Sequence, residues 1–209
     1  MKSAVAPYRL PPFFWSLIIV GMAFVGIRRD TLLSGHRKVL DHYGDIPEFQ
    51  LFNQEGKIVT LKDLRGNIWV AGFIFTRCGG PCPIITARMA ELSKILKEKG
   101  SQAKLVSITV DPDYDTPVIL SRYAEGFHAD PERWLFLTGQ REKVEALVTG
   151  GMYQAVVHNS QSGPPIHSTQ LVLVDSHGQI RAIHDGMNPE IITQVVRDIR
   201  GLEQEFTVN

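Results

Sequence analysis

The sequence predicts an α/β protein with a thioredoxin-like domain and an N-terminal transmembrane helix, on three observations. Segments with a helical period alternate with short apolar runs typical of buried strands. Both cysteines of the chain lie in "RCGGPCP", residues 77–83, directly after the most apolar of these runs. An uncharged apolar stretch near the N-terminus precedes all of this. A mixed sheet with helices on both faces and a cysteine loop after an early central strand describes the thioredoxin-like class.

Composition narrows the classes of function. The chain carries 22 Lys and Arg against 22 Asp and Glu, so its formal net charge is zero and no basic surface indicates a nucleic-acid partner. A hydrophobic fraction of 44% is ordinary for a globular protein. Two cysteines cannot hold a domain of this size together as a disulfide scaffold would, so we expect their role to be chemical.

The apolar stretch at residues 10–27 is the candidate membrane anchor. These eighteen uncharged residues lie between Arg9 and Arg28, and as a helix they would span roughly 27 Å at about 1.5 Å per residue. No small-x-small cleavage site follows them, which favours an uncleaved anchor over a signal peptide. We therefore expect an anchor at residues 1–29, a tether at 30–45 and the thioredoxin-like domain at 46–209.

The elements of the domain follow in order. Alternating residues around the turn signal Gln54–Gly56 predict a β-hairpin. The predicted elements after it are a central strand in 67–75, a helix in 84–100, a strand in 103–111, a helix in 116–127 that begins near Pro117, a strand in 133–139 and a short helix in 140–151. A strand hairpin in 167–186 and a helix in 188–202 end the domain, and Asn188 is the expected cap of that helix.

The cysteine loop, residues 77–83, predicts a metal or redox site. If the helix begins at Pro83, Cys82 is its N-cap, and the free N–H groups and dipole at that end would lower the cysteine pKa values. The common dithiol motif has two residues between its cysteines, whereas this loop has three, which weakens the oxidoreductase interpretation. A zinc site is also disfavoured, because the sequence has no second cysteine pair. Two thiolates suit Cu(I), and an added imidazole would extend the site to Cu(II).

A Cu(II) site would therefore need a histidine ligand, and two of the seven histidines are candidates. His158 and His167 flank the polar, Pro-rich segment 159–165. His167 precedes the strand of the terminal hairpin, and in thioredoxin-like folds the equivalent loop packs beside the cysteine loop. Chain geometry alone favours His167 over His158, and leaves open whether His167 is a ligand or a solvated loop histidine.

Three segments of this sequence together resemble the Sco (SenC) family of membrane-anchored copper proteins. They are "FTRCGGPCP", "TVDPDYDTP" and "IHSTQLVLVD", and the resemblance covers most of residues 45–200. The resemblance implies copper ligation by Cys78, Cys82 and His167, and it places Asp111 and Asp115 in the acidic motif of the family. Family members often carry bulkier, acidic or aromatic residues between the cysteines, where this chain has two glycines and a proline.

The acidic motif also has a structural interpretation. Asp111 would cap a turn and Asp115 would cap the following helix, and we favour this capping over direct contact with copper. An orienting or docking role for the two carboxylates stays open.

The resemblance implies a copper metallochaperone that assists assembly of the dinuclear copper centre of cytochrome c oxidase. Its expected partners are the copper-acceptor subunit of the oxidase and other copper chaperones or thiol reductants. The alternative is a thiol-disulfide oxidoreductase that reduces client cysteines through Cys78 and Cys82. A third reading, a thiol peroxidase, would need an arginine beside the reactive cysteine, and Arg77 is the local candidate.

The orientation of the anchor can be argued in two ways. Four basic residues follow the span within residues 28–38, and simple positive-inside counting would leave the domain in the cytoplasm. The resemblance is to a family that works on the outer face, and we give it the greater weight. We therefore expect a single-pass protein of the inner membrane with its domain in the periplasm.

Overall fold

The computed structural model describes residues 40–153, 156–157, 166–167 and 169–207. All of them belong to a compact unit that comprises Val39–Asn209. Within these described ranges, no helix is both long and apolar enough to cross a membrane. The expected anchor, residues 1–29, lies outside the described residues.

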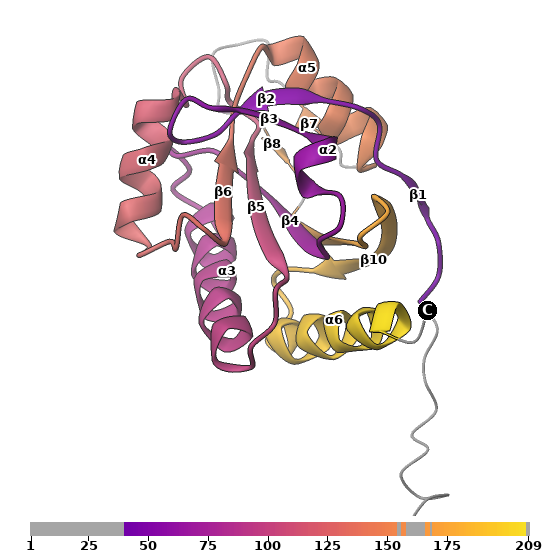
Figure 1. Cartoon of the computed structure of the whole chain (residues 1–209). Coiled ribbons are helices and arrows are strands. Elements are labelled where there is room, and N and C mark those ends of the chain that lie inside the picture. Colours follow the sequence, from indigo (N-terminus) through magenta and orange to yellow (C-terminus); the bar gives the residue numbers. More distant parts are fainter. Residues whose placement is uncertain (1–39, 154–155, 158–165, 168, 208–209) are drawn as a thin grey trace, which may run out of the picture. The chain divides into compact units, whose positions relative to one another are not determined.

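The described elements follow the predicted alternation of strands and helices (Figure 1). The strands are β1 (Gly44–Asp45), β2 (Gln50–Phe52), β3 (Ile58–Thr60), β4 (Trp69–Ile74), β5 (Lys104–Thr109), β6 (Trp134–Leu137), β7 (Val156–Val157), β8 (Ile166–His167), β9 (Gln170–Val174) and β10 (Gln179–Asp185). The helices are α2 (Leu61–Leu64), α3 (Pro81–Glu98), α4 (Pro117–Gly126), α5 (Arg141–Glu145), the π-helix η1 (Ala146–Gly151) and α6 (Ile191–Thr207).

The main sheet is mixed, as expected of a thioredoxin-like fold. Its strand order in the described residues is β1-β10-β9-β4-β5-β6. Strands β4, β5 and β6 are parallel, because helices α3 and α4 carry the chain back between them. Strand β9 runs antiparallel to β4, and β10 runs antiparallel to β9. The carboxyl ends of β4 and β5 and the start of β9 therefore lie at the same edge of the sheet.

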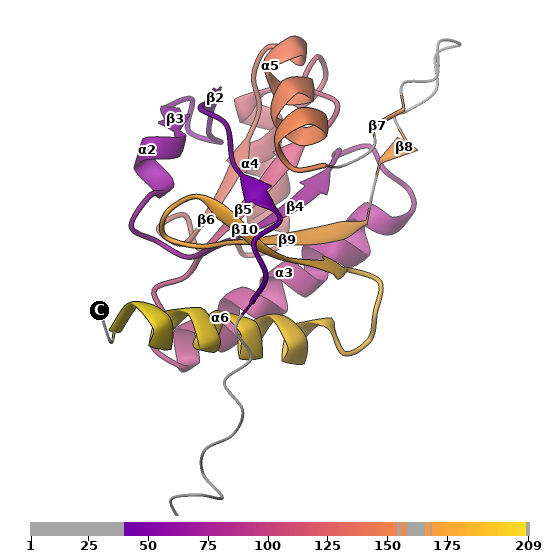
Figure 2. The same cartoon turned by 90° about the vertical axis from the view of Figure 1, so that its right-hand side faces the viewer.

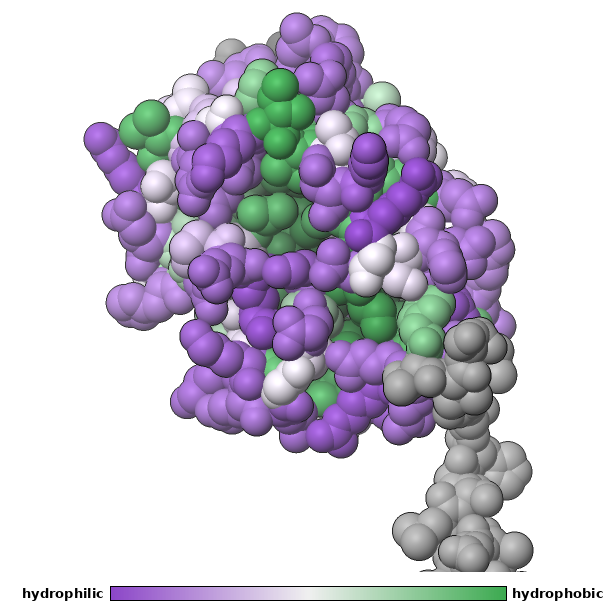
Figure 3. Space-filling model, viewed as in Figure 1, coloured by the Kyte–Doolittle hydropathy of each residue, from purple (hydrophilic) through white to green (hydrophobic). Residues whose placement is uncertain are grey.

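Helices cover both faces of this sheet. Figure 1 shows α3, α4 and α6 along one face, and α5 with the β2–β3 hairpin and α2 along the other. Figure 2 shows α3 and α6 next to each other below the sheet. The central strand β4 is buried at all six positions because both of its faces are covered. Most of the molecular surface seen in Figure 3 is hydrophilic, with apolar side chains showing between the elements.

The β2–β3 hairpin closes the open edge of β6. The Gln54 side-chain amide donates to the Trp134 carbonyl (3.2 Å), and its oxygen accepts from the Phe136 backbone N–H (2.8 Å). Phe52 and Thr138 exchange two backbone hydrogen bonds. The free backbone groups of an edge strand are thus satisfied within the chain.

The folded domain begins before residue 46. Leu40 is buried, and β1 at residues 44–45 pairs with β10, although the sequence analysis placed both in the tether. Arg181, nine-tenths buried, holds this entry segment by donating to the carbonyls of Leu40 (3.0 Å) and Asp41 (3.2 Å). Arg181 also pairs with Glu205 near the end of α6 (3.2 Å). The start and the end of the domain are therefore tied together.

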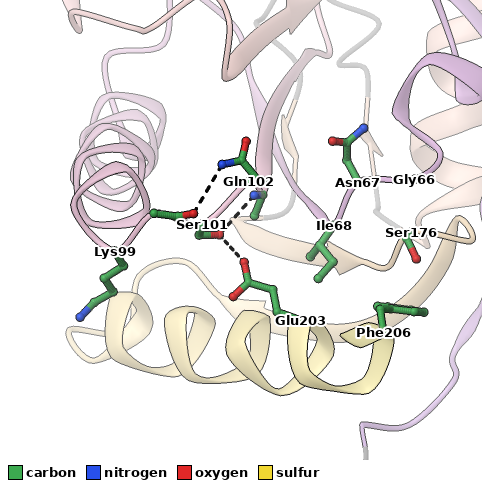
Figure 4. Close-up of a pocket in the computed structure, with 11 residues that line it drawn as sticks. Gly66, Asn67, Ile68, Lys99, Ser101, Gln102, Ser176, Glu203 and Phe206 are labelled. Atoms are coloured by element: carbon green, nitrogen blue, oxygen red, sulfur yellow. Dashed lines mark hydrogen bonds between the residues drawn. The ribbon is translucent and has the colours of Figure 1, made fainter. Parts of the chain in front are cut away.

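A shallow pocket of about 380 Å³ lies at the amino ends of β4 and β5 (Figure 4). Its lining includes Ile68 and Ala103, which directly precede these strands, and Phe206 from α6. Ser101 donates a 2.5 Å hydrogen bond to Glu203 across it. The cysteine loop follows the opposite, carboxyl end of β4, so this pocket takes no part in the candidate site.

Candidate metal centre

The cysteine loop joins the central strand β4 to helix α3. The helix begins at Pro81 rather than at the expected Pro83, with Gly80 as the residue before its first turn. Pro81 fits this first position because its missing N–H would have no partner inside the helix. Cys82 is therefore the second residue of the helix and not its N-cap, and Cys78 lies in the preceding loop.

The two cysteines are not joined by a disulfide, and their surroundings differ. Cys82 is fully buried, whereas Cys78 is partly exposed. Burial, together with the neighbouring Cys78 side chain, raises the pKa of Cys82 to about 12. The expectation of a lowered pKa is wrong for Cys82. Its loss of solvation outweighs the backbone N–H groups that favour a thiolate there.

The first turn of α3 is tied to helix α4 behind it. Thr86 donates to the Cys82 carbonyl (2.9 Å), and its hydroxyl lies 2.9 Å from the hydroxyl of Tyr123. Burial raises the pKa of Tyr123 to about 12, so this phenol is protonated and hydrogen-bonding at neutral pH. Nothing in the local sequence pointed to Tyr123, because its role comes from packing between two helices.

The loop itself offers one backbone donor to Cys78. The Gly80 N–H lies 3.4 Å from the Cys78 sulfur, and the Cys78 N–H donates to the Phe75 carbonyl (3.2 Å). A Cβ at Gly79 would meet no atom within 4 Å. Packing thus leaves space for a side chain at Gly79.

Asp115 holds the end of β4 against the end of β5. Its buried carboxylate accepts from the Thr76 N–H (3.1 Å), the Thr76 hydroxyl (2.5 Å) and the Thr109 hydroxyl (2.5 Å). Burial raises the pKa of Asp115 above the usual value for an aspartate, although these three hydrogen bonds oppose the rise. Asp115 does not cap α4, because Thr116 is the N-cap and accepts from the Ile119 N–H (3.4 Å).

Asp111 holds the residue next to Cys78. The Arg77 Nε and Nη2 atoms both donate to one Asp111 oxygen, at 2.9 and 2.7 Å, and the Arg77 guanidinium lies 4.4 Å from the centre of the Tyr114 ring. The Asp111 carbonyl accepts from the N–H groups of Tyr114 and Asp115, so the expected turn does form. The carboxylates of Asp115 and Asp111 therefore bind Thr76 and Arg77, which are the two residues before Cys78. This is the orienting role that the sequence left open.

His167 lies in the two-residue strand β8, opposite Val156 of β7. Its side chain, like the whole of His158, is outside the described residues, so its ligand role stays a prediction. Two backbone facts bear on its position. His167 lies three residues before Gln170, where β9 begins antiparallel to β4, so this stretch of chain runs toward the edge that carries the cysteine loop.

The contacts of Gly186 also bear on the position of His167. The Gly186 N–H donates to the Thr169 carbonyl (3.1 Å). A Cβ on Gly186 would lie 2.4 Å from that same carbonyl oxygen and 2.5 Å from the Ile85 side chain in the first turn of α3. Residue 169 and Ile85, three residues after Cys82, are therefore close neighbours. The segment that follows His167 therefore lies beside the start of α3, next to the cysteine loop.

In the part of the chain that the structure describes, no three His, Cys, Asp or Glu side chains are grouped to hold a metal. The described histidines have other contacts. His42 lies 3.1 Å from Asp45, His184 lies 3.4 Å from Asp198, and His177 packs edge-on against Phe206. None of these three contacts involves a cysteine, and the His184 side chain is only 10% exposed.

Comparison with known proteins gives one consistent result. The family model SCO1/SenC matches residues 41–201. A SCO1 protein homolog of Bacillus subtilis is 30% identical over 157 residues, which cover 75% of this chain and 81% of that protein.

Two solved structures show the same fold. One is BsSco, described as a member of the Sco family of cytochrome c oxidase assembly proteins with a disulfide switch; it has a TM-score of 0.72 at 29% identity, covering 80% of this chain and 98% of that one. The other is Arabidopsis thaliana ScoI with copper bound, with a TM-score of 0.66 at 24% identity, covering 77% of this chain and 99% of that one.

Proposed function

Because the chain belongs to the SCO1/SenC family, we propose that it is a copper metallochaperone that assists assembly of the dinuclear copper centre of cytochrome c oxidase. Copper is the cargo expected of the family, and the donor set of this chain fits it. The observation that carries the proposal is the pair of reduced thiols in the cysteine loop and the first turn of α3, one buried and one partly exposed. Soft sulfur donors of this kind select Cu(I).

The surroundings of the thiols suggest how copper is taken up and released. Cys78, the exposed member, is the one that an incoming copper complex or an acceptor can reach. Cys82 lies behind it and keeps its proton until copper replaces it, because burial raises its pKa. Copper exchange would then proceed through Cys78 first, with Cys82 completing the site.

His167 is the proposed third donor. Its segment enters β9 beside the first turn of α3, as the contacts of Gly186 with Thr169 and Ile85 support. A neutral imidazole added to two thiolates gives a donor set that also accommodates Cu(II). We assign His158 no role in the site.

The location and partners belong to the same proposal. Residues 10–27 would anchor the chain in the inner membrane, with the domain on the periplasmic side. The receiving partner would be the copper-acceptor subunit of the oxidase. Other copper chaperones or thiol reductants would supply copper and electrons on this side of the membrane.

A thiol-disulfide oxidoreductase is the second candidate, and the pair of reduced thiols favours it. The thiolate of Cys78 would attack a client disulfide, releasing one client thiolate, and Cys82 would then displace the second client sulfur as the Cys78–Cys82 disulfide forms. The raised pKa of Cys82 would slow that second step. The peroxidase reading loses support, because Arg77 is engaged by Asp111 and Tyr114.

Replacement of His167 tests the first candidate against the second. We expect His167→Ala to weaken Cu(II) binding and change its optical and paramagnetic spectra, while Cu(I) stays bound to the two thiolates. Disulfide exchange with a small disulfide should persist, since it needs only the thiols. His158→Ala is the matched control and should resemble the wild type. An unchanged Cu(II) spectrum in His167→Ala, together with a collapse of exchange, would favour the reductase.

A further inference from the structure

The cation nearest in sequence to the thiol pair is Arg77, which directly precedes Cys78. Its side chain is about half exposed, and the carboxylate that binds it, Asp111, is only 7% exposed. Both bonds end on a single Asp111 oxygen, and the Tyr114 ring covers the guanidinium at 4.4 Å. Arg77 is therefore held against Asp111 and Tyr114, one residue before Cys78, instead of extending freely into solvent.

The charge of the copper site depends on the oxidation state of the metal. Two thiolates and a neutral imidazole give a net charge of −1 with Cu(I) and zero with Cu(II). A fixed cation close by stabilises the more negative state, and a fixed anion does the opposite. The balance between Arg77 and Asp111 therefore bears on which copper ion the site prefers.

We propose that Arg77 is a positioning residue for charge: its guanidinium, held by Asp111 and Tyr114, biases the site toward Cu(I), and Asp111 limits that bias. This inference rests on the proposed copper function and adds a control of the oxidation state to it.

Asp113 of the same loop and Arg141, the first residue of α5, form a control pair. Arg141 donates to Asp113, two residues from Asp111, through Nε at 3.1 Å and through Nη2. This pair has the same charges as Arg77 and Asp111, and its carboxylate lies on the same loop, residues 111–115. Asp113 is exposed, and Thr76 and Arg77 are held by Asp115 and Asp111 instead.

The experiment measures the affinity of the full-length chain for Cu(I) and for Cu(II) separately, each by competition with a chromophoric chelator. We expect Arg77→Met to lower the ratio of Cu(I) to Cu(II) affinity by about three- to tenfold, the size of a charge effect near a protein surface. Asp111→Asn should raise the ratio. The double variant, which restores the net charge, should return to within about twofold of the wild type.

Further variants separate charge from packing. Arg77→Lys keeps the charge but loses the two-bond contact with Asp111, so its ratio should lie between those of Arg77→Met and the wild type. Arg141→Met and Asp113→Asn should stay within about twofold of the wild type. The inference is overturned if the double variant keeps the shift of Arg77→Met, because the residue would then act through packing. It is also overturned if the control pair shifts the ratio equally.

Failure of the proposed function would look different. If Cu(I) binding by the wild type survives the replacement of both Cys78 and Cys82 by Ser, the site is elsewhere and the copper proposal falls, taking this inference with it. If the wild type binds both ions through its cysteines and Arg77→Met leaves the ratio unchanged, only the role of Arg77 is refuted.

Discussion

At the scale of single residues, the two cysteines differ more than their spacing suggests. Cys82 is fully buried inside the first turn of α3, while Cys78 stays partly exposed in the loop. The helix N-terminus favours a thiolate, but burial opposes it more strongly at Cys82, whose pKa rises to about 12. A buried thiol of this kind keeps its proton near neutral pH.

Copper affinity should consequently depend on pH. Below pH 12 Cys82 is protonated in the metal-free domain, and Cu(I) binding must release that proton, so higher pH favours binding. We expect the apparent Cu(I) affinity to rise about tenfold per pH unit from this one proton between pH 6 and 8. Chelator competition across that range, corrected for protonation of the chelator, measures it. Cys82→Ser should show a weaker pH dependence, and a flat profile in the wild type would contradict the prediction.

At the scale of elements, the site is built where two parallel strands end. Strands β4 and β5 are in register along six residues, so Thr76 and Thr109 come together at their carboxyl ends. Asp115 receives a hydrogen bond from each of them. The acidic loop thereby fixes the direction in which the chain leaves β4 and enters the cysteine loop.

Removal of the Asp115 carboxylate should destabilise the domain. Asp115→Ala would leave three donors on Thr76 and Thr109 unpaired, two of them on a residue that is partly buried, and we expect a loss of about 3 kcal/mol in the free energy of unfolding. Urea denaturation followed by circular dichroism measures this. Asp113→Ala, at an exposed carboxylate of the same loop, should cost less than about 1 kcal/mol. Equal losses in both variants would show that Asp115 has no special role.

At the scale of the whole molecule, the chain joins the domain before the boundary expected from its sequence. Leu40 is buried and β1 pairs with β10, and Arg181 links this segment to Glu205 of α6. The turn between β9 and β10, close to this entry point, lies at the amino end of β4. The cysteine loop follows the carboxyl end, so the domain is attached to the preceding chain far from its site.

Truncation tests this boundary. A fragment of residues 39–209 should unfold with the same midpoint as a fragment of residues 30–209. A fragment of residues 46–209 loses β1 and leaves Arg181 without its two carbonyl partners. We expect it to be about 2 to 4 kcal/mol less stable, because buried hydrogen-bond donors and the apolar surface under Leu40 become exposed. Equal stability of all three fragments would return the boundary to residue 46.

The order of strands and helices, the cysteine loop and the family could all be read from the sequence, because they depend on local patterns and motifs. The hairpin around Gly56, the buried run of β4 and the start of α4 at Pro117 were predicted by alternation, apolar content and proline placement, and the structure confirms them. The sequence also selected Cys78 and Cys82 through their spacing alone.

Only the tertiary structure decided what surrounds these cysteines. The burial of Cys82 and the hydrogen bonds of Asp115 and Asp111 to Thr76 and Arg77 all depend on contacts between residues far apart in the chain. Helix-capping rules assigned the carboxylates to their own loop, because such rules consider only near neighbours. Desolvation likewise has no local signal, so the sequence could name the ligand candidates while only packing determined their acidity and orientation.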